Sequence, residues 1–118
     1  MTEQRHSRSG LHRIYYRTAL HELGHWTGHA SRLGRDQSGP FGSADYAREE
    51  LCAELASAFL CAALGIVPTV RHADYLANWL AVLRADNRAI FKAASGASKA
   101  ADFLLNCVGS AVPLEAAA

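Results

Sequence analysis

The stretch His21-Glu22-Leu23-Gly24-His25 places two histidines four residues apart, with a glutamate directly after the first. On an α-helix, side chains four residues apart lie on one face, one turn from each other. Two imidazoles at this spacing can bind one zinc ion, and Glu22 is offset around the helix so that it can reach a zinc-bound water without becoming a ligand. The pattern predicts zinc ligands at His21 and His25 and a general base at Glu22.

Length and composition indicate a single domain without a strong overall charge. The chain has 118 residues, of which 50% are hydrophobic and 19% are charged, and its formal net charge is +1. A charge this small creates no general attraction to nucleic acid or to a membrane surface. No segment has the roughly 18 consecutive apolar residues that a bilayer-spanning helix needs, and the N-terminus lacks the apolar core of a secretory signal. We therefore expect a cytoplasmic protein with no membrane partner.

The three cysteines, Cys52, Cys61 and Cys107, form no C-x-x-C pair and are odd in number. Each lies in an apolar run that is expected to be helical. We interpret all three as reduced thiols of the core rather than as metal ligands or disulfides.

Hydrophobic periodicity predicts a helical chain with little strand. A first helix is expected from about Ile14 to Thr27, ended by Gly28. Residues 34–44 are rich in Gly, Pro and Ser, so they are expected to form a loop. Three further helices are expected, at residues 46–64, 72–85 and 88–108.

The second expected helix has signals at both ends. Ser43 or Asp45 can cap its N-terminus, and Gly65 with Pro68 ends it. The first helix repeats apolar side chains at three- and four-residue steps, and the third is expected to bury one face. These side chains are Tyr16, Ala19, Leu20, Leu23 and Trp26 in the first helix and Tyr75, Leu76, Trp79, Leu80 and Leu83 in the third, with both tryptophans interpreted as core residues.

Zinc held by two histidines needs a third protein ligand and leaves a fourth position for water. In the extended HExxHxxGxxH pattern a third histidine follows six residues after the second. Ser31 occupies that position in this chain, and His29 comes too early for the same geometry. The third ligand is therefore expected on a later helix, where a carboxylate can supply it.

Glu50 and Glu54 are four residues apart on the second expected helix and share a face with small and apolar residues. A carboxylate on such a face needs a partner, which a zinc centre would provide. We assign Glu50 as the third ligand and Glu54 as the acceptor that orients a ligand histidine, while the reverse assignment, with Glu54 as the ligand, stays open. Glu49 is expected to face solvent.

These motifs, taken together, resemble the zincin-like metallopeptidase domain of ArdC-type antirestriction proteins, which also occurs in plasmid primases of the TraC type. The resemblance covers roughly residues 14–108. It is specific because the histidine motif continues as His25-Trp26-Thr27-Gly28-His29 and is followed by the acidic run of the second helix. The runs that carry it are residues 21–29, 32–35, 41–43 and 46–54, and it continues through Tyr75, Trp79, Leu83 and Asp86 to residues 89–91 and 100–102.

The resemblance implies a mainly α fold of the α+β zincin-like type with a gluzincin-type site. The small sheet that usually precedes the zinc helix is expected to be reduced or missing, because only about a dozen polar residues come before that helix here. The expected division is a basic flexible arm at residues 1–13, the zincin-like metallopeptidase domain at 14–108 and a disordered tail at 109–118.

By the family pattern, His21, His25 and a glutamate of the second helix would bind Zn²⁺, and Glu22 would be the catalytic base. The expected function is hydrolysis of peptide bonds in a protein or peptide substrate, within a plasmid or other mobile-element protein that protects DNA against restriction. Single-stranded DNA would be bound by a separate N-terminal domain. The alternatives are a non-catalytic, zinc-stabilised antirestriction module that binds DNA or a restriction enzyme, and a remnant that does not fold alone.

Peptide hydrolysis also benefits from a hydrogen-bond donor to the oxyanion. Tyr46, Arg71, His72 and Tyr75 are candidates by residue type only.

Overall fold

The computed structural model describes residues 2–66 and 73–111, and within these ranges the fold consists of four helices. They are α1 (Thr2–Thr27), α2 (Ala44–Leu64), α3 (Ala73–Ala85) and α4 (Ala89–Ala111). These described ranges contain no strand, which confirms the expectation of a mainly α fold. Pro68, Arg71, His72 and residues 112–118 of the expected tail lie outside the described residues.

The ends of α2 follow from its local sequence. Ser43, in extended conformation, is the N-cap, and its Oγ accepts a hydrogen bond from the Tyr46 N–H at 3.1 Å. Gly65 closes the C-terminus with a left-handed φ of 70°, a conformation that costs glycine little because it has no Cβ. Both signals were predicted, and of the two candidate N-caps the structure uses Ser43. They fix the length of the helix that carries the acidic residues.

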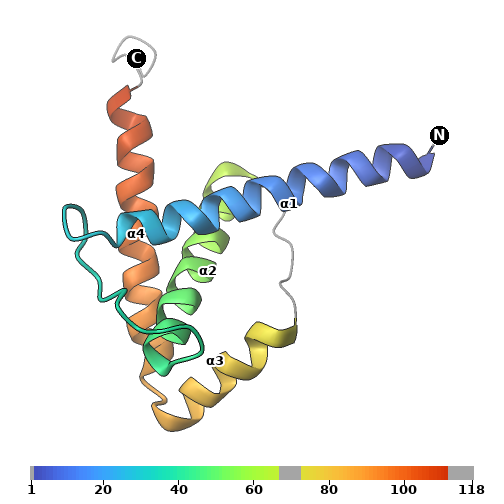
Figure 1. Cartoon of the computed structure of the whole chain (residues 1–118). Coiled ribbons are helices and arrows are strands. Elements are labelled where there is room, and N and C mark those ends of the chain that lie inside the picture. Colours follow the sequence, from blue (N-terminus) through green and yellow to red (C-terminus); the bar gives the residue numbers. More distant parts are fainter. Residues whose placement is uncertain (1, 67–72, 112–118) are drawn as a thin grey trace.

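Helix α1 begins at Thr2, twelve residues before the start expected at Ile14. Its N-terminal half projects beyond the other helices, as Figure 1 shows. Hydrophobic periodicity detects helices that bury an apolar stripe, and residues 2–13 have none. Arg, Gln and Glu are nevertheless good helix formers, which is consistent with the longer helix. The limits proposed for a separate arm remain a prediction.

Helix α2 lies at the centre of the molecule and contacts α1, α3 and α4 (Figure 1). Small side chains line these contacts. A Cβ added at Gly24 of α1 would lie 3.3 Å from the Ala53 Cα and 3.4 Å from the Ala56 Cβ of α2. Glycine therefore lets the two backbones approach closely one residue away from His25. Cys52 and Ala56 also pack against Ala97 and Ala100 of α4.

The face that α1 turns toward α2 is polar and small. Of the apolar stripe of α1, Tyr16, Leu23 and Trp26 are all exposed by more than 40%, while Ala19 and Leu20 are half-buried. Trp26 is therefore not a core residue, and the Arg32 guanidinium stacks over its ring at 3.8 Å. The buried residues of α1 within the described side chains are Arg17, His21, Gly24 and Thr27.

The buried side of α3 also differs from the expected one. Leu80 is 51% exposed, whereas Val82 is buried against Ala47 and Ala89, with Leu83 packed beside them. Trp79 is half-buried. The side chains of Tyr75 and Leu76 lie outside the described ones. No helix in the described part of the chain has the length and apolar character to cross a membrane.

The three cysteines are free, but only two of them are core residues. Cys52 and Cys61 are buried, and burial raises the pKa of both thiols, that of Cys52 to about 11. Cys107 is exposed near the end of α4, which corrects its expected place in the core. The thiolate is the reactive form, so burial and a raised pKa both slow modification.

We therefore expect one fast-reacting thiol per native chain when an aromatic disulfide reagent is added at pH 8, and three after denaturation. Replacing Cys107 with serine should remove the fast phase entirely. A fast phase of two or three thiols in the native wild-type chain would contradict this assignment of burial.

Candidate metal centre

Three potential metal ligands converge between α1 and α2. The Nε2 atoms of His21 and His25 lie 3.0 Å apart. The Glu50 carboxylate faces both, at 3.2 Å from His21 Nε2 and 2.8 Å from His25 Nε2. Within the described residues these three side chains are brought together as one group that could hold a metal ion. The histidine pair comes from the last turns of α1 and the glutamate from the second turn of α2.

The chemistry and spacing of this group fit a divalent metal ion. Two imidazole nitrogens and one carboxylate oxygen are donors that zinc and other divalent transition metals accept. Bonds of about 2.0–2.1 Å in a tetrahedral site separate neighbouring ligand atoms by roughly 3.3 Å. The two Nε2 atoms lie 3.0 Å apart, close to that value, and each has one Glu50 oxygen nearby, Oε2 at 3.2 Å from His21 and Oε1 at 2.8 Å from His25. Three protein ligands would leave a fourth position for water.

Without an ion, the charges of the group compensate one another. Burial by itself would lower the pKa of His25, but hydrogen bonds with Glu49 and Glu50 outweigh it and raise that pKa to about 9. Burial would raise the pKa of Glu50, but hydrogen bonds with His21 and His25 lower it to about 2. A cation at this position is therefore stabilised, whether it is an imidazolium or a metal ion.

His21 contacts Glu54, the residue predicted to orient a ligand histidine. Its Nδ1 lies 2.9 Å from Glu54 Oε2, and Glu54 Oε1 accepts a hydrogen bond from Arg17 Nη1 at 2.9 Å. A carboxylate on Nδ1 favours the tautomer whose Nε2 carries the free electron pair. Glu54 thus faces the ring nitrogen that points away from the converging group, while Glu50 faces the nitrogen inside it.

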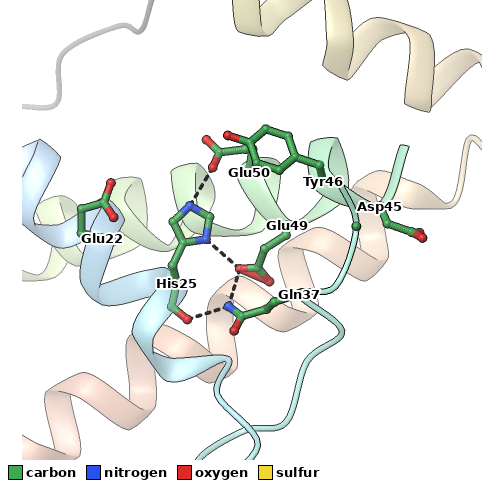
Figure 2. A pocket seen from close by; sticks show the side chains of 8 residues that line it. Glu22, His25, Gln37, Asp45, Tyr46, Glu49 and Glu50 are labelled. Carbon is green, nitrogen blue, oxygen red and sulfur yellow. Dashed lines mark hydrogen bonds and ion pairs between the residues drawn. The ribbon is translucent and has the colours of Figure 1, made fainter. Parts of the chain in front are cut away.

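His25 is held in the same way by Glu49, which corrects the expectation that Glu49 faces solvent. Glu49 Oε2 lies 2.9 Å from His25 Nδ1, and the glutamate side chain is only 10% exposed (Figure 2). Burial would raise the pKa of Glu49, but hydrogen bonds from His25 and Arg35 lower it, so the carboxylate is ionised. The sequence contained a signal for this position. Glu49 precedes the buried residues Ala53, Ala56 and Leu60 at helical spacing.

Glu22 lies at the edge of the converging group. It is exposed, on the opposite side of His25 from Glu49 in Figure 2. It lines a cavity of about 280 Å³ together with His25 and Glu50. An exposed carboxylate beside the ligand group is the placement that a base acting on water requires. The other residues that line this cavity are Gln37, Gly39, Asp45, Tyr46 and Glu49.

The remaining candidates separate into those near the centre and those away from it. His29 is exposed, and its Nδ1 lies 2.8 Å from Ser31 Oγ, so it is not part of the group, as the sequence indicated. Tyr46 lines the cavity next to Glu50 and remains a candidate donor. Arg71 and His72 lie outside the described residues, as does the side chain of Tyr75.

Comparison with known protein families gives a match over most of this chain. The profile of the zincin-like metallopeptidase family (MPTase-PolyVal) matches residues 3–96, a range that includes the histidine pair and all three glutamates of α2. The chain belongs to the zincin-like metallopeptidase family. The resemblance identified in the sequence is thereby confirmed.

Relatives of known name agree with this family. DNA primase TraC of Escherichia coli is 55% identical over 92 residues, which are 77% of this chain and 9% of the primase. The Mn(II)-bound crystal structure of the antirestriction protein ArdC from plasmid R388 has a TM-score of 0.70 and 48% identity, covering 78% of this chain and 35% of ArdC. Its metal-free crystal structure has a TM-score of 0.67 and 49% identity, covering 77% and 33%.

The relatives add two points. The family and the Mn(II)-bound ArdC structure imply a divalent metal for this type of domain. This chain spans about a tenth of the primase and about a third of ArdC, so it corresponds to one part of each.

Proposed function

We propose that this chain is a zinc-dependent metallopeptidase domain of an antirestriction protein. In this proposal His21, His25 and Glu50 bind Zn²⁺ and Glu22 is the catalytic base. The observation that carries it is the convergence of both Nε2 atoms on the Glu50 carboxylate, with Glu22 beside them on the same cavity. A site that only stabilised the fold would not need an exposed carboxylate there.

A zinc ion bound by these residues would lower the pKa of a water molecule and polarise the carbonyl of the substrate. Glu22 would accept a proton from the attacking water and return it to the amine that leaves. Glu54 and Arg17 would hold His21 in the tautomer that presents Nε2. The open side of the cavity, next to Tyr46 and Asp45, would admit a peptide or protein substrate.

The names of the relatives support a proposal for the setting of this activity. Their names refer to antirestriction and to DNA priming. We propose that the domain acts on a protein substrate in a plasmid-encoded, cytoplasmic protein, and that single-stranded DNA is bound by a different domain of that protein.

Removal of the metal should abolish hydrolysis. Purified chain is incubated with a mixture of random peptides, and new N-termini are detected by mass spectrometry. We expect cleavage that stops with a chelator and returns when one equivalent of Zn²⁺ is restored, because without the ion water is a poor nucleophile at neutral pH.

A metal-loaded, folded chain that cleaves no peptide would contradict the peptidase proposal. It would favour the second candidate, a non-catalytic module that binds DNA or a restriction enzyme. The names of the relatives are the observation in favour of that candidate, since none of them refers to proteolysis.

A further inference from the structure

Each histidine of the pair contacts a glutamate through Nδ1, and that glutamate contacts an arginine. For His21 these residues are Glu54 and Arg17, both on helices. Behind His25 stand Glu49 and Arg35, and Arg35 belongs to the loop between α1 and α2. The sequence predicted Glu54 as the acceptor for a ligand histidine but not Arg17, and the arrangement at His25 depends on a loop that carries no metal ligand.

The loop holds Glu49 through several hydrogen bonds. Arg35 donates from Nε to Glu49 Oε1 at 2.8 Å and from Nη2 to Oε2 at 3.1 Å, a two-point contact that fixes the carboxylate plane. Gln37 Nε2 donates to the same Oε2 at 3.2 Å (Figure 2). The carboxylate therefore keeps one orientation, with Oε2 directed at His25 Nδ1.

The same two loop residues also hold the end of α1. Arg35 Nη2 donates to the Gly24 carbonyl at 2.6 Å, and Gln37 Nε2 donates to the His25 carbonyl at 2.7 Å. These carbonyls lie in the last turn of the helix, beyond the regular backbone ladder, and Arg35 and Gln37 add to the local donors Thr27 Oγ1 and Gly28 N–H. Arg35 and Gln37 thus bind both the backbone at the end of α1 and the Glu49 carboxylate that contacts the His25 ring.

We propose that Glu49 is a positioning residue for His25, and that Arg35 and Gln37 act through it, so that the loop sets the geometry of the metal centre. The inference rests on the proposed metal-binding function. A carboxylate on Nδ1 keeps the proton there and leaves the Nε2 electron pair free for the ion. Loss of Glu49 would let the ring rotate and change tautomer, although all three ligands would remain.

The test compares the metal affinity of Glu49→Gln and Glu49→Ala with that of the wild-type chain, by competition with a chromophoric chelator. We expect the dissociation constant for Zn²⁺ to rise about 10- to 100-fold, the usual effect of removing such a partner. Asp102→Asn is the matched control, because it removes the same charge from an exposed position on α4 that does not line the cavity. Its loss should change the affinity less than about twofold.

Two further measurements separate positioning from a merely structural role. In the variants saturated with Co²⁺, we expect the visible absorption bands to shift in Glu49→Gln and to stay unchanged in Asp102→Asn, because these bands report ligand geometry. Arg35→Ala should weaken binding in the wild-type background and have a smaller effect in the Glu49→Ala background. Glu49→Gln keeps the side-chain volume, so it serves if Glu49→Ala does not fold.

The outcomes are distinct. A wild-type chain that binds no metal overturns the proposed function and this inference with it. A wild-type chain that binds one ion, together with a Glu49→Gln variant that matches the control in affinity and spectrum, overturns the inference alone.

Discussion

The Glu50→Ala variant is expected to lose stoichiometric metal binding, with an affinity at least about 100-fold below that of the wild-type chain. Glu50 contributes the carboxylate that faces both Nε2 atoms, at 3.2 and 2.8 Å. Loss of a residue that only supports a ligand histidine already costs 10- to 100-fold, so loss of a ligand should cost more. The affinity is measured by competition with a chelator of known strength, after circular dichroism has established that the variant is folded.

Glu54→Ala is the informative comparison, because the sequence left open which of the two glutamates is the ligand. Glu54 contacts His21 Nδ1, outside the converging group. The Glu54→Ala replacement is therefore expected to lower the metal affinity only about 10- to 100-fold. The opposite ranking, with Glu54→Ala unable to bind metal and Glu50→Ala close to wild type, would overturn the assignment.

The Glu22→Gln variant is expected to keep its metal and lose its activity. Glu22 lies at the cavity beside the ligands but outside the group that could hold a metal, so an amide there should leave metal binding unchanged. A side chain that accepts and returns a proton contributes typically 10²- to 10⁴-fold to the rate, and glutamine cannot do either. We therefore expect kcat to fall by that factor on a peptide that the wild-type chain cleaves.

Two measurements on the same sample make this result decisive. Metal content establishes that the ligands still bind, and a shallow or absent pH dependence of the residual rate indicates that the base is missing. If Glu22→Gln cleaves the peptide at the wild-type rate, Glu22 is not the base. If Glu22→Gln protects DNA against restriction as well as the wild-type chain does, proteolysis is not needed for that protection.

The sequence predicted α2 well because strong local signals determine it. Ser43 and Gly65 fix its ends, and the spacing of Glu50 and Glu54 places both carboxylates toward α1. The histidine motif likewise follows from helix geometry alone. These expectations placed Glu50 and Glu54 near the histidine pair but left open which of them is the ligand, and the structure groups Glu50 with His21 and His25.

The remaining features depend on tertiary structure. Periodicity identified the apolar stripe of α1 but not that this stripe would lie outside, because the inner face is occupied by Arg17, His21 and Thr27. Each of these side chains has a hydrogen-bond partner on α2 or in its own helix, which offsets the cost of burial, although Arg17 Nε is buried without one. Glu49 was misplaced for a related reason, since its half-buried partner Arg35 comes from a loop whose course the sequence did not predict.

The most direct test of the metal centre is the X-ray absorption spectrum of the wild-type chain loaded with one equivalent of Zn²⁺. Two imidazole ligands with additional oxygen, at metal–ligand distances of about 2.0–2.1 Å, are the predicted result. A spectrum with a sulfur ligand at about 2.3 Å, or without the outer-shell scattering of two imidazoles, would contradict a centre formed by His21, His25 and Glu50.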